Sequence, residues 1–344
     1  MASLPKLFVT GGAGFIGSAF VRLCLEKDTF GQITNCDALT YAGNLDNLEG
    51  LDGHRHNFFR GNIVDREAVL TALEPGTDAI INFAAETHVD RSIVSAGDFL
   101  RTNITGTQVL LDAAREKGVR RFVHISTDEV MGSLPENENA FFTEQSPFAP
   151  NSPYAASKAA AEHLVRAAHH TFGLDTVITR CGNNYGPRQF PEKFLPLVLS
   201  NTLNDEPIPV YGDGQNVRDW IYVDDHCRAI LLALEKGTPG ATYNIGARNE
   251  QRNLDVAWSV LDALQKPRSL IRFVKDRPGH DRRYAIDPTR IETELGWRPL
   301  ETWDSGLEKT IRWYQENTSW INRARSGAYR EFYARQYGME AGKA

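Results

Sequence analysis

The sequence predicts an α/β fold in which a doubly wound parallel sheet is followed by a smaller C-terminal α/β part. Three features predict it. The first is an apolar run at residues 7–9 that leads into a glycine-rich turn and a helix-like stretch. The others are an alternation of apolar runs with amphipathic segments up to about residue 180, and a change to loop-rich, polar sequence near residue 184. Such alternation is typical of parallel sheets covered by helices. We expect a first domain at residues 1–184 with a return segment at about 219–236, and a second domain, mainly residues 185–344, that includes the C-terminal tail.

The composition excludes several classes of protein. A chain of 344 residues is longer than one hydrophobic core usually holds, so two domains are expected. The formal net charge of −6 argues against binding to nucleic acid or to an anionic membrane. No apolar run is long enough to cross a bilayer, and the four cysteines are scattered without metal-ligand spacing. We therefore expect a cytoplasmic protein with free thiols, no metal site, and no nucleic-acid or membrane partner.

The turn TGGAGFIG, residues 10–17, indicates a Rossmann-type dinucleotide site. Gly11, Gly14 and Gly17 permit a tight turn and a close backbone approach, and the start of the following helix offers free N–H groups to a pyrophosphate. Asp37 lies 20 positions after Gly17, at the end of the next predicted strand. A carboxylate there accepts both ribose hydroxyls of NAD and repels the extra phosphate of NADP. The alternative is a solvated aspartate at a strand end.

The next elements continue the alternating pattern. Residues 58–65 are expected to be a short third strand and its exit loop. Residues 79–85 are almost continuously apolar, as a strand buried on both faces should be, and they end in small alanines beside which a cofactor can pass. A helix is expected to open at residues 102–107.

The strand predicted at residues 121–126 ends in Thr127, Asp128 and Glu129. In a doubly wound sheet the ligand lies beyond the carboxyl ends of the strands, so these side chains are candidates for chemistry. The polar cluster at residues 86–92 could line a sugar pocket, although a solvated loop is nearly as good an interpretation.

A helix is predicted to start at Ser152, a good N-cap, with Pro153 at its first position. Tyr154 and Lys158 are four residues apart and share one face. An ammonium nearby favours the phenolate and is expected to lower the pKa of the tyrosine, so that it can act as a base. Alone, the pair would be explained as well by an exposed helix edge.

Loop-rich segments dominate the second half, at residues 183–193, 211–219 and 276–283. Arg218 and Arg277 are candidates for the diphosphate of a nucleotide-linked substrate, because a guanidinium fork matches phosphate oxygens. Solvated surface arginines are the alternative. A helix is expected from residue 220 to residue 234, and it would return to the first domain.

Together these motifs resemble the extended short-chain dehydrogenase/reductase superfamily, and within it the dTDP-glucose 4,6-dehydratase family. The similar segments include TGGAGFIGS, FAAETHVDRSI, HISTDEV, SPYAASKAAAEHLV, NNYGPRQFPEK, YGDGQNVRDWIYVDDH and DRPGHDRRYAID. They extend over nearly the whole chain. The Thr-Asp-Glu triplet is the most specific of them, because the epimerases and decarboxylases of the superfamily generally lack its acidic pair.

The resemblance implies a lyase of deoxysugar biosynthesis that holds NAD and forms a homodimer through helices of the first domain. It implies that Tyr154, with Lys158, is the base at C4 and that Thr127 bonds the C4 oxygen. It implies that Glu129 takes the C5 proton and that Asp128 protonates the departing C6 hydroxyl. The residues expected to contact NAD are Gly11, Gly14, Phe15, Ile16, Gly17, Asp37, Ala38, Leu39, Thr40, Asn62, Ile63, Phe83, Ala84, Ala85, Thr102, Tyr154, Lys158 and Asn184. Those expected to hold the nucleotide sugar are Thr87, Thr127, Asn183, Lys193, Phe194, Pro209, Tyr211, Arg218, Asn253, Arg277 and His280.

Two positions depart from the family pattern. Asn62 stands where an aspartate usually faces the adenine, and its carbonyl can still accept from the adenine amine, so weaker NAD binding is the most that we expect. Met131 replaces a tyrosine before Gly132 and is expected to affect the range of substrates. Three alternatives stay open: a dehydratase acting on UDP-glucose or another nucleotide sugar, a sugar-nucleotide 4-epimerase, and a non-catalytic NAD-binding regulator.

Overall fold

The computed structural model describes residues 5–136, 139–326 and 328–338. Its centre is a parallel sheet of seven strands in the order β10-β6-β5-β4-β1-β2-β3. The strands are β1 Lys6–Thr10, β2 Gln32–Asp37, β3 His56–Arg60, β4 Ala79–Asn82, β5 Arg121–Thr127, β6 Asp175–Cys181 and β10 Thr242–Ile245. The chain winds outward in opposite directions from the neighbours β1 and β4, so the crevice for a ligand opens at their carboxyl ends. The predicted fold class is confirmed.

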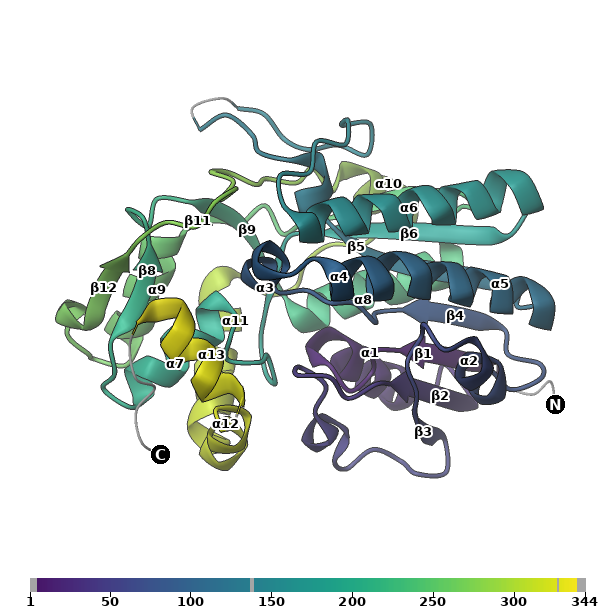
Figure 1. Cartoon of the computed structure of the whole chain (residues 1–344), viewed down its shortest axis with the longest axis horizontal. Helices are drawn as coiled ribbons and strands as arrows, with labels where there is room; N and C mark the ends of the chain where they lie inside the picture. The colour runs from purple at the N-terminus through teal and green to yellow at the C-terminus, as the bar shows by residue number, and fades with distance from the viewer. Residues whose placement is uncertain (1–4, 137–138, 327, 339–344) are drawn as a thin grey trace.

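Helices cover both faces of this sheet (Figure 1). On one face α1, Phe15–Glu26, and α8, Val223–Lys236, pack against Leu7, Val9 and Ile81. On the other face α2 Arg66–Ala72, α5 Thr107–Lys117 and α6 Pro153–Phe172 pack against Phe8, Ile80 and Phe122. Successive strand residues therefore enter opposite cores, which explains why these runs are almost continuously apolar.

The rest of the chain forms a smaller α/β part with a core of its own beside the central sheet (Figure 1). It contains two small sheets, β11-β9-β7 and β12-β8. Their strands are β7 Asn183–Tyr185, β8 Ile208–Tyr211, β9 Val217–Tyr222, β11 Glu250–Arg252 and β12 Ile271–Val274. The helices are α7 Phe194–Leu203, α9 Asn253–Ala263, α11 Trp303–Glu316, α12 Thr318–Ala324 and α13 Ala328–Tyr337. The exact division into two domains stays a prediction, since β10 and α8 join the first sheet from late in the chain.

Short elements complete the described chain. They are α3 Val89–Val94, α4 Gly97–Phe99, α10 Thr289–Leu295, the π-helical η2 Leu100–Gly106, and the 3-10 turns η1 Leu45–Leu48, η3 Asp128–Met131 and η4 Arg268–Leu270. Among the residues that the structure describes, no helix combines the length and the apolar character needed to cross a membrane. All four cysteines are buried and free.

Three predicted boundaries are wrong. The helix expected to open at Thr102 already begins at Gly97 and passes through the π-helical η2 into α5. The helix expected from Trp220 begins at Val223, because Val217–Tyr222 pairs as strand β9 with β7 and β11. A short apolar run fits a strand as well as a helix, and here the neighbouring strands decide. The strand predicted to reach residue 85 ends at Asn82, so Ala84 and Ala85 lie in the loop.

Candidate active site

The turn between β1 and α1 has the backbone that an anion site requires. Gly11 has a φ of +72°, and a Cβ there would lie 2.6 Å from the backbone nitrogen of Ala84. A Cβ at Gly17 would lie 2.3 Å from the carbonyl oxygen of Gly11. Helix α1 begins after Gly14 without a side-chain cap and without an acidic residue in its first turn. Its first N–H groups are therefore available to a pyrophosphate, and these residues fit a dinucleotide.

A cavity of about 100 Å³ adjoins this turn at the ends of β2 and β3. Asp37 lies in its wall, where one carboxylate oxygen accepts the N–H of Ala13 at 3.0 Å and the other accepts the N–H of Leu39 at 2.8 Å. Burial raises the pKa of Asp37, against the effect of these two bonds. Asn62 also lines this cavity, and its Oδ1 accepts the N–H of Val64 at 3.1 Å. The amide at position 62 thus makes the same local turn that an aspartate would make.

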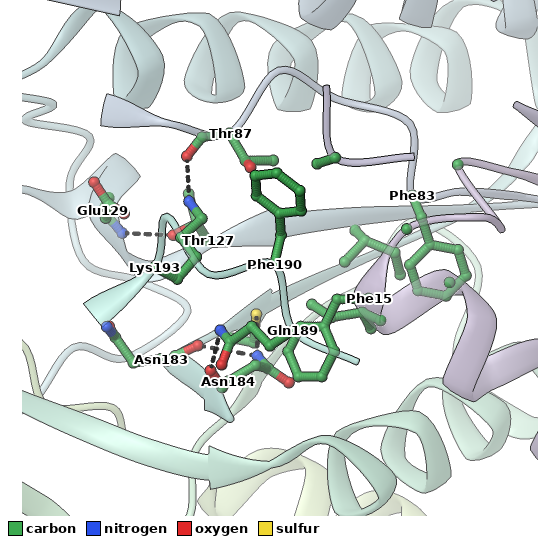
Figure 2. A pocket seen from close by; sticks show the side chains of 18 of the residues that line it. Phe15, Phe83, Thr87, Thr127, Glu129, Asn183, Asn184, Gln189, Phe190 and Lys193 are labelled. Atoms are coloured by element: carbon green, nitrogen blue, oxygen red, sulfur yellow. Dashed lines mark hydrogen bonds between the residues drawn. The ribbon is translucent and has the colours of Figure 1, made fainter. Parts of the chain in front are cut away.

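A second cavity, of about 270 Å³, shares Gly11, Gly14, Ala42 and Phe83 with the first, so the two form one trough. All five predicted catalytic residues line it: Thr127, Asp128, Glu129, Tyr154 and Lys158. Figure 2 shows Thr127, Glu129 and Lys193 on one side of this cavity, Phe15 and Phe83 on the other, and the ring of Phe190 between them.

Thr127 organises the acidic pair at the end of β5. Its hydroxyl accepts the N–H of Glu129 at 3.3 Å and donates to Asp128 at 3.2 Å. Burial, with the charge of Glu129 as the second cause, raises the pKa of Asp128 well above its usual value. Burial also raises the pKa of Glu129, while Arg277 and Lys193 act in the opposite direction. The pKa of Asp128 is raised mainly by burial and by the Glu129 charge, whereas the positive charges near Glu129 oppose the rise of its pKa, so the two environments differ in the direction that one acid and one base require.

Tyr154 and Lys158 reach the cavity from the first turns of α6, where the Ser152 hydroxyl caps the helix as predicted. The Lys158 ammonium donates to the carbonyl of Ile125 at 2.6 Å, and burial lowers its pKa to about 8. The predicted lowering of the Tyr154 pKa is wrong for this structure. Burial raises that pKa well above its usual value and Glu129 adds to the rise, although a hydrogen bond with Thr127 opposes it. Burial removes solvation from the phenolate, and the Glu129 carboxylate repels its charge.

Most of the predicted contact residues lie in the walls of the trough. Every predicted NAD residue except Leu39 lines one of its two cavities. Of the predicted substrate residues, the trough is lined by Thr87, Thr127, Asn183, Lys193 and Phe194. The Lys193 ammonium donates to the carbonyl of Thr87 at 2.7 Å, so this lysine spans from the second part of the chain to the first.

The other predicted substrate residues lie outside these walls, namely Pro209, Tyr211, Arg218, Asn253, Arg277 and His280. Arg218 is buried, and its guanidinium donates to the carbonyls of Val217 and Asp281 at 2.7 and 2.8 Å. Arg277 donates to Asp90 at 3.2 Å, and the hydroxyl of Tyr211 donates to the other oxygen of Asp90 at 3.0 Å. Asp90 thus connects α3 to two of the predicted substrate residues.

Sequence reasoning missed several residues of the cavity wall. Gln189, Phe190 and Glu192 line it, from the loop between β7 and α7. Burial raises the pKa of Glu192 to about 7, and its carboxylate lies 3.8 Å from His88 and 3.6 Å from Arg91. The loop was recognised as polar, but nothing local in its sequence indicates which side chains turn inward.

Met131 lines neither cavity of the trough. It is buried in a cluster with Val130, Phe142 and Tyr284, and it contacts the guanidinium of Arg180 through its sulfur. Met131 therefore makes no direct contact with the trough that would support its expected effect on the range of substrates.

The comparisons with known proteins agree with this geometry. A model of the GDP-mannose 4,6 dehydratase family matches residues 8–310. A dTDP-glucose 4,6-dehydratase of Salmonella typhimurium is 48% identical over 357 aligned residues, which cover 96% of this chain and 99% of the relative. The chain belongs to the dTDP-glucose 4,6-dehydratase family. The resemblance inferred from the motifs is confirmed.

Solved structures of this family and its neighbours show the same fold. The crystal structure of DesIV, a dTDP-glucose 4,6-dehydratase of Streptomyces venezuelae with NAD bound, superposes with a TM-score of 0.90 at 49% identity, covering 93% of this chain and 99% of that one. A UDP-glucose 4-epimerase of Thermus thermophilus with NAD superposes with a TM-score of 0.84 at 31% identity, covering 91% and 99%. Because an epimerase shares the fold, the architecture alone does not separate a dehydratase from its neighbours.

Proposed function

We propose that this protein is an NAD-dependent hydro-lyase that converts dTDP-glucose to dTDP-4-keto-6-deoxyglucose. The proposal rests on one observation. Asp128, Glu129, Tyr154 and Lys158 line the same cavity, and this cavity adjoins the one that contains Asp37. Family membership at 48% identity over nearly the full length supports the substrate and the cofactor.

The glycine turn and the first turn of α1 would hold the pyrophosphate of NAD, and Asp37 its adenosine ribose. When bound, NAD would supply the hydride acceptor for C4 of the sugar and the hydride donor for C6. It ends as it began, so tight retention of the cofactor is expected.

In the first step Tyr154, after releasing its own proton to solvent, accepts the proton of the C4 hydroxyl as a phenolate. Lys158, which lies in the same cavity, stabilises the phenolate that must form, and the Thr127 hydroxyl bonds the C4 oxygen. The need for this step is chemical: a C5 proton of an unactivated hexose is not acidic, but it becomes acidic beside a C4 ketone.

Elimination then falls to the acidic pair. Glu129 takes the C5 proton while Asp128 gives its proton to the departing C6 hydroxyl, which leaves as water. Glu129 returns its proton to C5 when C6 receives the hydride, which leaves a C6 methyl group and a C4 ketone. Burial and the neighbouring Glu129 charge raise the pKa of Asp128, which favours the protonated form that this role needs.

The diphosphate of the substrate would be held by Lys193, Arg218, Arg277 and His280. Arg218 and Arg277 already act on the pKa of Glu129, so their positive charge reaches the catalytic end of the cavity. The backbone carbonyls around Arg218 and the carboxylate of Asp90 hold both guanidiniums in place before a phosphate arrives.

The experiment that tests this function uses substrate deuterated at C4. We expect the label in the C6 methyl group of the product, together with the loss of one water by mass spectrometry. A product without loss of water would indicate the 4-epimerase, and no reaction with any nucleoside-diphosphate glucose would indicate the non-catalytic regulator. Competing dTDP-glucose against UDP-glucose decides the nucleotide.

The rate of elimination is expected to fall in acid at a higher pH than a free glutamate would dictate. Glu129 must be ionised to take the C5 proton, and burial raises its pKa above the usual value of about 4.3. As the pH falls through this raised pKa, the base becomes protonated and the rate drops. Because Asp128 and Glu129 interact, the apparent values belong to the pair. A single-turnover pH profile checks this, and an acidic limb at or below the free value would contradict it.

We also propose a homodimer in the cytoplasm. The side chains of Val94 and Leu100, on α3 and η2, are 84% and 49% exposed, so a partner covering them would bury apolar surface. Four free cysteines suit a reducing compartment. Sedimentation velocity tests the dimer, and a monomer at micromolar concentration would refute it.

A further inference from the structure

The loop that follows β2, residues 38–49, covers the trough. Thr40, Ala42 and Gly43 line its cavities, so a bound dinucleotide would lie directly beneath this cover loop. The opposite side of the cover loop contacts α12, a helix of the second part that lines neither cavity of the trough.

Asn47 joins the cover loop to the glycine turn. Its side chain is buried, and its amide nitrogen donates to the carbonyl of Ala13 at 2.9 Å. The same carbonyl accepts the N–H of Asn44 at 3.1 Å, while the N–H of Ala13 donates to Asp37 at 3.0 Å. Residue 13 is therefore fixed on both sides by the cover loop and by the ribose-binding aspartate.

The other end of the Asn47 amide reaches α12. Its Oδ1 accepts the indole N–H of Trp320 at 3.0 Å, across a gap of 273 positions in the sequence. Trp320 is buried, and its ring lies 5.2 Å from that of Trp313 in the core of the second part. Nearby, the guanidinium of Arg323 pairs with Asp46 at 2.7 Å. The cover loop is thus tied at adjacent residues to a rigid aromatic core.

We propose that Asn47 and Trp320 are a positioning pair that holds the cover loop against the glycine turn and slows release of the dinucleotide. To free the cofactor, the loop must lift from Ala13, and that movement separates a buried amide from a buried indole N–H. Leaving such groups without partners is costly, so the pair opposes the opening motion. This inference rests on the proposed function, because it assumes that the trough holds NAD.

A Trp320→Phe variant removes the N–H and keeps most of the ring. We expect NAD to leave the purified holoenzyme about two- to tenfold faster, as the loss of one buried hydrogen bond implies. Trp313→Phe is the matched control, since it makes the same chemical change one ring away and should leave the rate of release as it is. The measurement is the rate at which NAD passes from each holoenzyme to an excess of a scavenging dehydrogenase, with the melting temperature recorded beside it.

Arg323→Gln is a second variant, and we expect it to fold normally because the Arg323 side chain is 56% exposed. Loss of its surface ion pair should speed release about 1.4- to fivefold. A purely structural role for Trp320 would lower the melting temperature and leave the release rate unchanged, and it would overturn the inference. Equal acceleration in Trp313→Phe and Trp320→Phe would overturn it as well. If the wild-type protein binds no dinucleotide, both the proposed function and the inference about the positioning pair fail. If the wild-type protein binds the dinucleotide and Trp320→Phe releases it at an unchanged rate, only the positioning pair is refuted.

Discussion

In a Glu129→Gln variant, oxidation at C4 is expected to proceed while elimination of water stops. Glutamine keeps the size of the side chain and the backbone N–H that bonds Thr127, but it cannot take the C5 proton. Loss of a general base of this kind costs about 10²–10⁴ in rate. Reduced nicotinamide should therefore accumulate on the enzyme after substrate is added, and its absorbance in a stopped-flow instrument is the measurement.

An Asp128→Asn variant is the comparison that separates the two carboxyl groups. It too should accumulate reduced nicotinamide, because the C6 hydroxyl lacks its proton donor. In heavy water, however, Asp128→Asn should still exchange the C5 proton through Glu129, whereas Glu129→Gln should not. Exchange at C5 in Glu129→Gln, or full turnover by that variant, would contradict the role given to Glu129.

The parts of the site that could be predicted from sequence are those formed by consecutive residues. The glycine turn needs only its own backbone and the start of α1, and Thr127, Asp128 and Glu129 follow directly from the end of β5. Once a strand–turn–helix pattern indicates a doubly wound sheet, the edge of the sheet at which the crevice lies follows, although the exact strand ends do not.

The parts that could not be predicted depend on contacts between distant segments. Glu192 enters the cavity because a loop of the second part folds over α3, and nothing in the neighbouring sequence signals its buried position. The same holds for Asn47 and Trp320, which meet only after both cores have formed. The last three residues of β9, 220–222, were predicted as the start of a helix, because the pairing of β9 with β7 and β11, and not its own pattern, decides its structure.

The Tyr154 pKa shows a different kind of limit. Spacing places Tyr154 and Lys158 on one face of α6, but it does not give the depth of burial or the distance to Glu129. In the structure burial and the Glu129 charge raise the pKa of Tyr154, which favours the protonated phenol before reaction. Tyr154 must then release its own proton to solvent before it can accept the proton of the C4 hydroxyl.

A Tyr154→Phe variant should consequently fail at the first step. Phenylalanine preserves the packing of the ring against Phe99 and Val89 and leaves the helix cap at Ser152 unchanged, so the fold is expected to survive. Without the hydroxyl, the base assigned to the C4 proton is missing, and oxidation should slow by about 10²–10⁴. After addition of substrate the nicotinamide should stay oxidised, the opposite of the result expected for Glu129→Gln.

An experiment that bypasses the oxidation step also distinguishes Tyr154→Phe from Glu129→Gln. Given a 4-keto sugar nucleotide with the reduced cofactor already bound, Tyr154→Phe should eliminate water and form the C6 methyl group at nearly the wild-type rate, since Glu129 and Asp128 are intact. Glu129→Gln should fail in the same experiment, because it lacks the base for the C5 proton. If Tyr154→Phe fails in the bypass as well, then Tyr154 is also needed for the elimination, and a role confined to the C4 base is wrong.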